Sequence, residues 1–334
     1  MITALLAIDV GGSTSRATLV DYSGNCLGQG RSGGGNPGSN PPDAAAAAII
    51  AAAGAAVSEA DAPLDIRVAM LAVAGPRNAE VERRLNEAFR AMGLTGPMVM
   101  TGDTQAMLPS VTAALDGYCI FAGTGSGAVR VKHGEVDSVV DAVGYLIGDL
   151  GSGYWLGHHA AIAVAAALEG RGPKTALTEA VLGGLGIPND DAVASDGRPQ
   201  PLRDFIDIIY NKMRPIELAK FAPYVLAHAA DPVSADLLAR SGRYLLDNFR
   251  HVFDPDMPGP VVLGGSVAAH LSGLPNAVAD VLREAGHAPD IHLTGDPSVG
   301  AAVLALRHEG VVVHEALRAR IAASIAARRT TTQA

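Results

Sequence analysis

The fold is set by one stretch of sequence, LLAIDVGGSTSRATLVD, which covers residues Leu5–Asp21. Leu5–Val10 is an apolar run of strand length, and Ser15–Asp21 has the pattern of a second strand. Two glycines and two hydroxyl residues separate these strands (Gly11, Gly12, Ser13 and Thr14). Glycine lets the backbone turn tightly and come close to a ligand. The stretch therefore predicts a hairpin whose backbone N–H groups can face an anion such as phosphate.

Asp9 stands at the edge of this turn. A carboxylate beside a phosphate-sized nest requires a cation between the two negative groups, and Mg²⁺ with part of its water shell fits that place. Asp9 is therefore a candidate Mg²⁺ residue that acts through bound water. The alternative is an ordinary Gly-Gly hairpin with a solvated aspartate, because short glycine motifs are not specific.

Composition restricts the class of protein. The chain has 334 residues, enough for two domains, and is 49% hydrophobic but only 4% aromatic. Its net charge of −9 argues against nucleic acid and anionic membranes as partners. No apolar run reaches the roughly 18–20 residues of a membrane span, and no basic segment precedes the first apolar run. We expect a cytoplasmic protein.

The hairpin pattern occurs a second time. Tyr118–Ala122 is an apolar strand, Gly123–Gly127 is a glycine-rich turn with Thr124 and Ser126, and two further strand patterns follow. An internal repeat of this kind predicts two similar α/β domains that face each other across a cleft, each with a phosphate-binding hairpin. Two such turns with an aspartate beside one of them are more specific than either turn alone.

Asp103 follows a short strand predicted over Pro97–Thr101. A carboxylate at the carboxyl end of a strand in an open α/β sheet points into the ligand crevice. Thr104–Leu115 has the pattern of a helix, so the alternative is that Asp103 only caps that helix.

Three other polar segments are candidates for ligand contact. The glycine-rich loop Ser32–Pro41 is either a linker or a substrate loop in which Asn36 offers an amide. Asp149, in the segment Gly144–Gly153, could cap the next helix, hold a sugar hydroxyl or hold a metal-bound water. Gly264–Ser266 follows a late strand and is either a shelf for a nucleoside or a close strand–helix junction. Residues 173–255 are predicted to be mainly helical and to carry no catalytic constellation, with Met213, Tyr224 and Phe249 in the core.

The motifs together resemble a known group. They occur in the order seen in the actin/hexokinase/Hsp70-like ATPase superfamily, and more closely in the N-acetylglucosamine kinase branch of the BadF/BadG/BcrA/BcrD ATPase family. The resemblance covers roughly residues 4–310 and is weakest over 170–255. It implies a duplicated ribonuclease-H-like fold with two domains around an ATP cleft. We expect one domain from residues 1–115 with the helices of about 297–328, and a second from 116–296 with a helical segment at 170–255.

The resemblance also implies roles for individual residues. Asp103 would be the catalytic base toward the sugar hydroxyl, and Asp9 would organise Mg²⁺. ATP phosphates would lie on the two hairpins (Gly11, Gly12, Ser13, Thr14, Gly123, Thr124, Gly125 and Ser126). The nucleoside would contact Gly264, Gly265 and Ser266. The sugar would contact Asn36, Asp103, Thr124 and Asp149.

The implied activity is an ATP- and Mg²⁺-dependent amino-sugar kinase that phosphorylates N-acetylglucosamine at its 6-hydroxyl, with glucosamine as the alternative substrate. Two other functions stay open, an ATPase that activates a radical dehydratase and a non-catalytic sugar sensor. Leu150 stands where the family commonly has a glutamate, so the sequence does not fix the sugar. The expected partners are ATP and an amino sugar. Because relatives are often dimers, the resemblance leaves a homodimer open as the oligomeric state.

Overall fold

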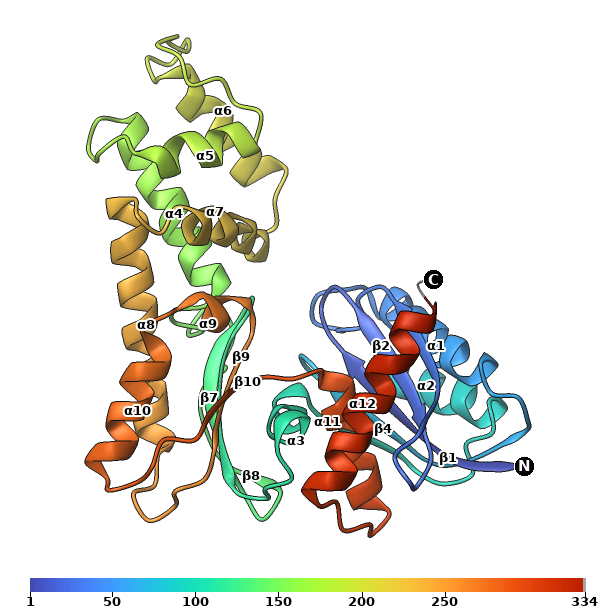
Figure 1. Cartoon of the computed structure of the whole chain (residues 1–334). Helices are drawn as coiled ribbons and strands as arrows, with labels where there is room; N and C mark the ends of the chain where they lie inside the picture. The colour runs from blue at the N-terminus through green and yellow to red at the C-terminus, as the bar shows by residue number, and fades with distance from the viewer. Residues whose placement is uncertain (333–334) are drawn as a thin grey trace. The chain divides into compact units, whose positions relative to one another are not determined.

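The computed structural model describes residues 1–332, which divide into two compact units. Unit 1 consists of Met1–Gly117, Val131–Val136 and the chain from His292 onward. Unit 2 consists of Tyr118–Arg130 and Asp137–Ile291. Figure 1 shows the chain coloured from its N-terminus to its C-terminus. Within the described residues, no helix is both long enough and apolar enough to cross a membrane.

Unit 1 is built on a five-stranded sheet in the order β3-β2-β1-β4-β5. Its strands are β1 (Ile2–Val10), β2 (Ser15–Val20), β3 (Cys26–Ser32), β4 (Leu64–Val73) and β5 (Met98–Gly102). The first three strands form an antiparallel meander, whereas β4 and β5 run parallel to β1. The carboxyl ends of β1, β4 and β5 therefore lie along one edge of the sheet, where ligand sites of α/β proteins form.

Helices cover both faces of this sheet. Successive residues of a strand point to opposite faces, so Leu6 and Ile8 pack with α1 (Pro42–Ser58) and α2 (Ala79–Ala91). Leu5 and Ala7 pack with α11 (Pro297–His308) and α12 (Glu315–Thr332). The alanine-rich α1 lies very close to β3, because a Cβ at Gly30 would stand 2.0 Å from the Ala52 carbonyl oxygen. Small residues on both elements make this approach possible.

Unit 2 contains a second five-stranded sheet in the order β10-β9-β6-β7-β8. Its strands are β6 (Gly117–Ala122), β7 (Ser126–Lys132), β8 (Glu135–Asp141), β9 (Val261–Gly264) and β10 (Ile291–Leu293). Read from the other end, the order β8-β7-β6-β9-β10 repeats that of unit 1 strand for strand. With the structural neighbours described below, this repetition confirms the predicted duplicated α/β fold.

The helices of unit 2 pack on one core with β6 and β9. They are α4 (Gly153–Leu168), α5 (Ala176–Gly184), α6 (Gln200–Asn211), η2 (Pro215–Phe221), α7 (Ala222–Ala227), α8 (Pro232–Val252), α9 (Ser266–His270) and α10 (Leu274–Glu284). Tyr118 on β6 is fully buried against Phe249 of α8, with ring centroids 5.5 Å apart. Residues 173–255 are mainly helical, as predicted, and form α5, α6, η2, α7 and α8; Figure 1 shows α5, α6 and α7 grouped with α4.

The predicted helix over Thr104–Leu115 is wrong in its extent. The chain instead makes a 3₁₀ turn, η1 (Asp103–Ala106), and a short helix, α3 (Met107–Val111). Gly102 precedes this turn as its N-cap, and Asp103 is the first residue inside it. Asp103 is therefore not the cap of a long helix.

Candidate functional site

The first hairpin of unit 1 closes through a short turn. The Gly11 N–H donates to the Thr14 carbonyl at 2.9 Å, and Val10 pairs with Ser15 where the strands separate. The loop after β3 supports the turn from behind, because the N–H groups of Gly35 and Asn36 donate to the Gly11 carbonyl. Gly12 and Ser13 at the tip are exposed. The predicted phosphate hairpin is thus a braced loop whose tip is open.

Asp9 is buried at the end of β1, with 8% of its surface exposed. It lies opposite Arg16 in the strand register, and the Arg16 guanidinium approaches its carboxylate at 3.4 Å. The pKa of Asp9 is raised to about 6, chiefly by burial and also by the negative charges of Asp103 and Asp296, and this value already includes the lowering effect of Arg16. The nearby Arg16 guanidinium therefore does not fully offset the cost of burying the ionised Asp9 carboxylate.

Asp103 and Asp296 supply the negative charge near Asp9. Asp103 comes directly after β5, and its carboxylate accepts the Thr104 N–H at 2.9 Å. Partial loss of hydration raises the pKa of Asp103, although the residue is open to solvent at the surface. Asp296 caps α11 and forms an ion pair with Arg329 of α12. Three segments of unit 1 thus bring the carboxylates of Asp9, Asp103 and Asp296 close enough for the charges of Asp103 and Asp296 to act on Asp9.

Asp9 and its neighbours fit a hydrated divalent cation. A buried carboxylate whose pKa is raised by burial and by two other acids gains from a positive ion in front of it. In residues 1–332, no group of three or more His, Cys, Asp or Glu side chains is placed to bind a metal ion directly. Mg²⁺ commonly keeps several waters and uses one or two carboxylates. Contact through water, as expected for Asp9, suits this donor set.

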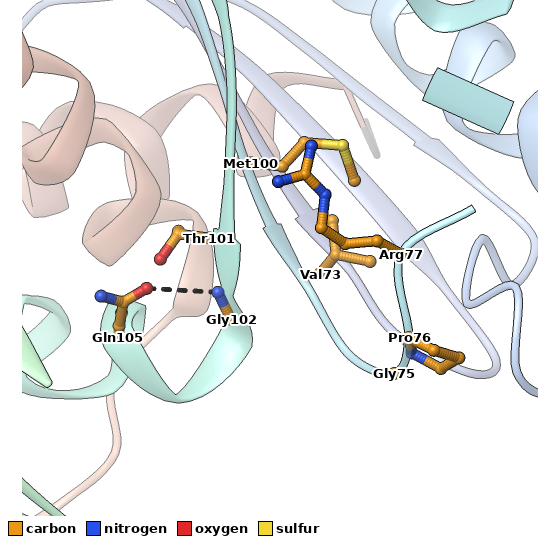
Figure 2. Close-up of a pocket in the computed structure, with 8 residues that line it drawn as sticks. All are labelled: Val73, Gly75, Pro76, Arg77, Met100, Thr101, Gly102 and Gln105. Atoms are coloured by element: carbon orange, nitrogen blue, oxygen red, sulfur yellow. Dashed lines mark hydrogen bonds between the residues drawn. The ribbon is translucent and has the colours of Figure 1, made fainter. Parts of the chain in front are cut away.

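A pocket of about 250 Å³ in unit 1 is lined by Gly102 and Gln105, which flank Asp103 in the chain, although Asp103 itself does not line it. Figure 2 shows its lining, which comes from the ends of β4 and β5 and the segments that follow them (Val73, Gly75, Pro76, Arg77, Met100, Thr101, Gly102 and Gln105). The Gln105 side-chain oxygen accepts the Gly102 N–H at 3.2 Å, which leaves its amide N–H groups as donors. The Arg77 guanidinium is held by two contacts to Glu82 at 2.6 and 2.7 Å.

Asn36 is tied into its own loop. Its side-chain oxygen accepts the Gly38 N–H at 2.7 Å and lies against Gly75, where a Cβ would stand 2.2 Å from it. Gly75 has a φ of +92°, which favours glycine. Asn36 therefore lies next to the segment that lines the pocket in Figure 2 without itself lining it.

The second hairpin, in unit 2, is held by Asp149. The Asp149 carboxylate accepts the Ser126 N–H at 3.2 Å, and the Ser126 hydroxyl donates to the Leu150 carbonyl at 2.9 Å. Asp149 is buried and has a φ of +56°, and burial raises the pKa of its carboxyl. Asp141 fixes this backbone by accepting the N–H groups of Asp149 and Leu150 at 2.7 and 3.0 Å. Asp149 thus positions the hairpin, a role that the sequence did not reveal.

A second pocket, of about 380 Å³, lies wholly within unit 2. The hairpin residues Gly123 and Thr124 and the start of α4 form one part of its wall. Ser266, Val267 and His270 of α9 form another, and small apolar residues of η2 and α7 complete it (Ala219, Ala222, Pro223, Leu226 and Ala227). The size and mainly apolar lining are typical of a small-ligand pocket.

Gly265 directly precedes the pocket residue Ser266, and its position requires glycine. Gly265 has a φ of +87°, and a Cβ there would stand 2.3 Å from the Ala122 carbonyl oxygen. Only glycine allows the start of α9 to approach the end of β6 so closely. Residues of η2 and α7, within the mainly helical segment 173–255, also line this pocket, which the sequence did not indicate. Their alanines and leucines at helical spacing gave no signal that distinguished a pocket wall from a core face.

Comparison with known proteins gives the family and the fold. The model of the BadF/BadG/BcrA/BcrD ATPase family matches residues 6–305. An N-acetyl-D-glucosamine kinase of Dictyostelium discoideum is 26% identical over 212 residues, which cover 60% of this chain. The match spans 62% of the length of that curated relative.

Two solved structures extend over nearly the whole chain. A provisionally assigned N-acetylglucosamine kinase of Chromobacterium violaceum is 25% identical, with a TM-score of 0.71, and the match covers 91% of this chain and 99% of that one. A second, from Porphyromonas gingivalis, is 23% identical with a TM-score of 0.66, covering 92% and 100%. The second supports the fold alone. Together these findings confirm the resemblance inferred from the ordered motifs.

Proposed function

The chain belongs to the BadF/BadG/BcrA/BcrD ATPase family, and on that premise we propose that it is an ATP-dependent sugar kinase. The acceptor we propose is N-acetyl-D-glucosamine, phosphorylated at its 6-hydroxyl, with glucosamine as the alternative acceptor. The Dictyostelium discoideum and Chromobacterium violaceum relatives, named for this sugar, support the choice of acceptor class.

One observation carries the proposal. Unit 1 combines a braced glycine hairpin, a buried carboxylate at its base and a second carboxylate beside a pocket. A protein that only bound a sugar would gain nothing from placing Asp9 and Asp103 where each disfavours the charge of the other. A phosphoryl-transfer site needs both, one for the cation and one for the acceptor hydroxyl.

Asp103 acts as the general base. Its carboxylate takes the proton of the acceptor hydroxyl as that oxygen bonds to the γ-phosphorus of ATP and the bond to the β,γ-bridging oxygen breaks. The products are the sugar phosphate and ADP, and Asp103 then loses its proton to water. Loss of hydration raises the pKa of Asp103, which makes its carboxylate a stronger base than that of an ordinary aspartate.

We propose that each of the two hairpins binds phosphate. In unit 1, Gly11, Gly12, Ser13 and Thr14 form the anion nest: the Gly11 N–H closes the turn on the Thr14 carbonyl, and the N–H groups of Gly12, Ser13 and Thr14 are proposed to face the phosphates. In unit 2, Gly123, Thr124, Gly125 and Ser126 provide a second nest, which Asp149 keeps in shape through the Ser126 N–H. Mg²⁺, held through water by Asp9, supplies charge neutralisation to the phosphates when bound.

We propose that the residues around Asp103 bind the acceptor sugar. The pocket of Figure 2 offers the Gln105 amide and the Thr101 hydroxyl, which suit the carbonyl and hydroxyl groups of an N-acetylated sugar. We further propose contacts of the sugar with Asn36, Thr124 and Asp149. In unit 2, Gly264, Gly265 and Ser266 with the 380 Å³ pocket would receive the nucleoside of ATP.

The test is ADP release by the purified protein with Mg-ATP and a panel of N-acetylglucosamine, glucosamine, N-acetylmannosamine and glucose. We expect turnover that depends on an amino sugar and falls about 10²–10⁴-fold in Asp103→Asn. Asp61→Asn, at an exposed carboxylate in a bend of unit 1, is the matched control and should keep full activity. ADP release at the same rate without any sugar, or none with any of the four, would rule the proposal out.

A further inference from the structure

His270 is the only titratable side chain that lines the 380 Å³ pocket of unit 2. It ends the short helix α9, and its Nδ1 lies 2.6 Å from the Ser266 carbonyl oxygen. A carbonyl oxygen can only accept a hydrogen bond, so Nδ1 carries the proton. The neutral ring then presents Nε2 as a lone-pair acceptor. Within the described chain, Nε2 has no hydrogen-bond partner.

The remaining polar groups of this pocket belong to its hairpin end. Thr124 is in the hairpin, and Ser266 follows Gly265, whose backbone lies against Ala122 and Gly123. His270 comes one helical turn later, about 6 Å further along α9. The walls between are small apolar side chains of η2 and α7, which can cover a flat ring but cannot accept a hydrogen bond.

We propose that His270 is a specificity-determining residue, whose Nε2 accepts a hydrogen bond from a donor on the bound nucleoside. Two donors have the required chemistry, the exocyclic amine of the purine and the ribose 2′-hydroxyl. This inference rests on the proposed use of ATP, and it adds that the pocket selects a nucleoside by one oriented acceptor. A base with an oxygen in place of the amine offers no donor there.

The experiment measures binding of ADP, IDP and 2′-deoxyADP to the purified protein by calorimetry with Mg²⁺ present. His270→Leu removes the acceptor, whereas His270→Gln keeps an oxygen that can accept and an N–H that can reach the Ser266 carbonyl. His251→Ala is the matched control, because His251 is exposed on α8 and makes the same contact to the carbonyl four residues earlier at 2.7 Å. It does not line the pocket.

We expect His270→Leu to weaken ADP binding about tenfold, as the loss of one hydrogen bond predicts. His270→Gln should recover part of this loss, and His251→Ala should bind as the wild type does. If the donor is the amine, the wild-type preference for ADP over IDP disappears in His270→Leu. If the donor is on the ribose, the preference for ADP over 2′-deoxyADP disappears instead.

Wild-type affinity for ADP in His270→Leu would overturn the inference and leave the kinase proposal standing. An equal loss for all three nucleotides would also overturn it, because no particular donor would then be recognised. Absence of ADP binding by the wild-type protein would instead remove the proposed function together with this inference.

Discussion

Replacing Asp9 with asparagine should stabilise the free protein while it removes the proposed cation site. The folded state holds the pKa of Asp9 at about 6, against 3.8 for an unperturbed aspartate. The folded protein therefore binds the Asp9 proton more tightly than the unfolded chain does. Stability contributed by this group is highest at low pH and is lost as the pH rises from about 4 to about 6.

The size of the effect follows from the two pKa values. Their difference of roughly two units corresponds to about 3 kcal/mol of unfavourable free energy at pH 7 and about 1.5 kcal/mol at pH 5. The pKa of about 6 already includes the attraction of Arg16, so no separate term is needed for that ion pair. Asparagine has the same shape, cannot ionise, and should recover most of this free energy.

The assay is urea unfolding of the wild type and Asp9→Asn at pH 5 and pH 7, without nucleotide or metal. We expect the variant to be more stable at both values, with about twice the gain at pH 7. The exposed control Asp61→Asn should change the free energy of unfolding by less than about 0.5 kcal/mol. An Asp9→Asn variant that is no more stable than the wild type at either pH would refute the electrostatic reasoning.

Three other changes test the supports of unit 2. Gly265→Ala introduces a Cβ that would meet the Ala122 carbonyl oxygen at 2.3 Å, at a φ of +87°, so it should cost about 1–3 kcal/mol of stability and weaken ADP binding. Urea unfolding identical to that of the wild type would contradict the claim that only glycine fits between α9 and the end of β6. Asp141→Ala removes the acceptor of two backbone N–H groups and should cost about 1–3 kcal/mol and raise the KM for ATP. Unaltered kinetics would show that the loop holds without it. Leu150→Glu should leave stability nearly unchanged, because its side chain is 40% exposed, and raise kcat/KM for the amino sugar by up to about tenfold. A kcat/KM for the amino sugar that stays constant or falls in this variant would show that residue 150 does not contribute to acceptor binding.

The hairpins could be predicted because their signal is local. A strand-length apolar run, two glycines and a second strand specify a tight turn without knowledge of the rest of the chain, and both copies are found. Asp103 could likewise be placed from its position after a strand. The predicted helix after it was wrong in its extent: the chain leaves the helix after Val111, where the Ala113 N–H donates to Glu315 and the Ala113 carbonyl accepts from Arg307, contacts that the local sequence pattern does not encode.

The parts of the site that could not be predicted depend on tertiary packing. Asp296 reads from the sequence as an ordinary cap before Pro297, and only the packing of α11 on the sheet of unit 1 brings its charge near Asp9. Asp149 has three plausible roles in the sequence, and the hydrogen bond to Ser126 is visible only once the loop is folded.

The central claim is that the γ-phosphoryl group of ATP is transferred to an amino sugar. Phosphorus NMR of a reaction with Mg-ATP and N-acetylglucosamine tests it most directly, because it identifies the product that receives the phosphoryl group. We predict a phosphomonoester signal coupled to the C6 protons of the sugar, present with the wild type and nearly absent with Asp103→Asn. Inorganic phosphate as the only new product, or an unchanged ATP spectrum, would contradict the account.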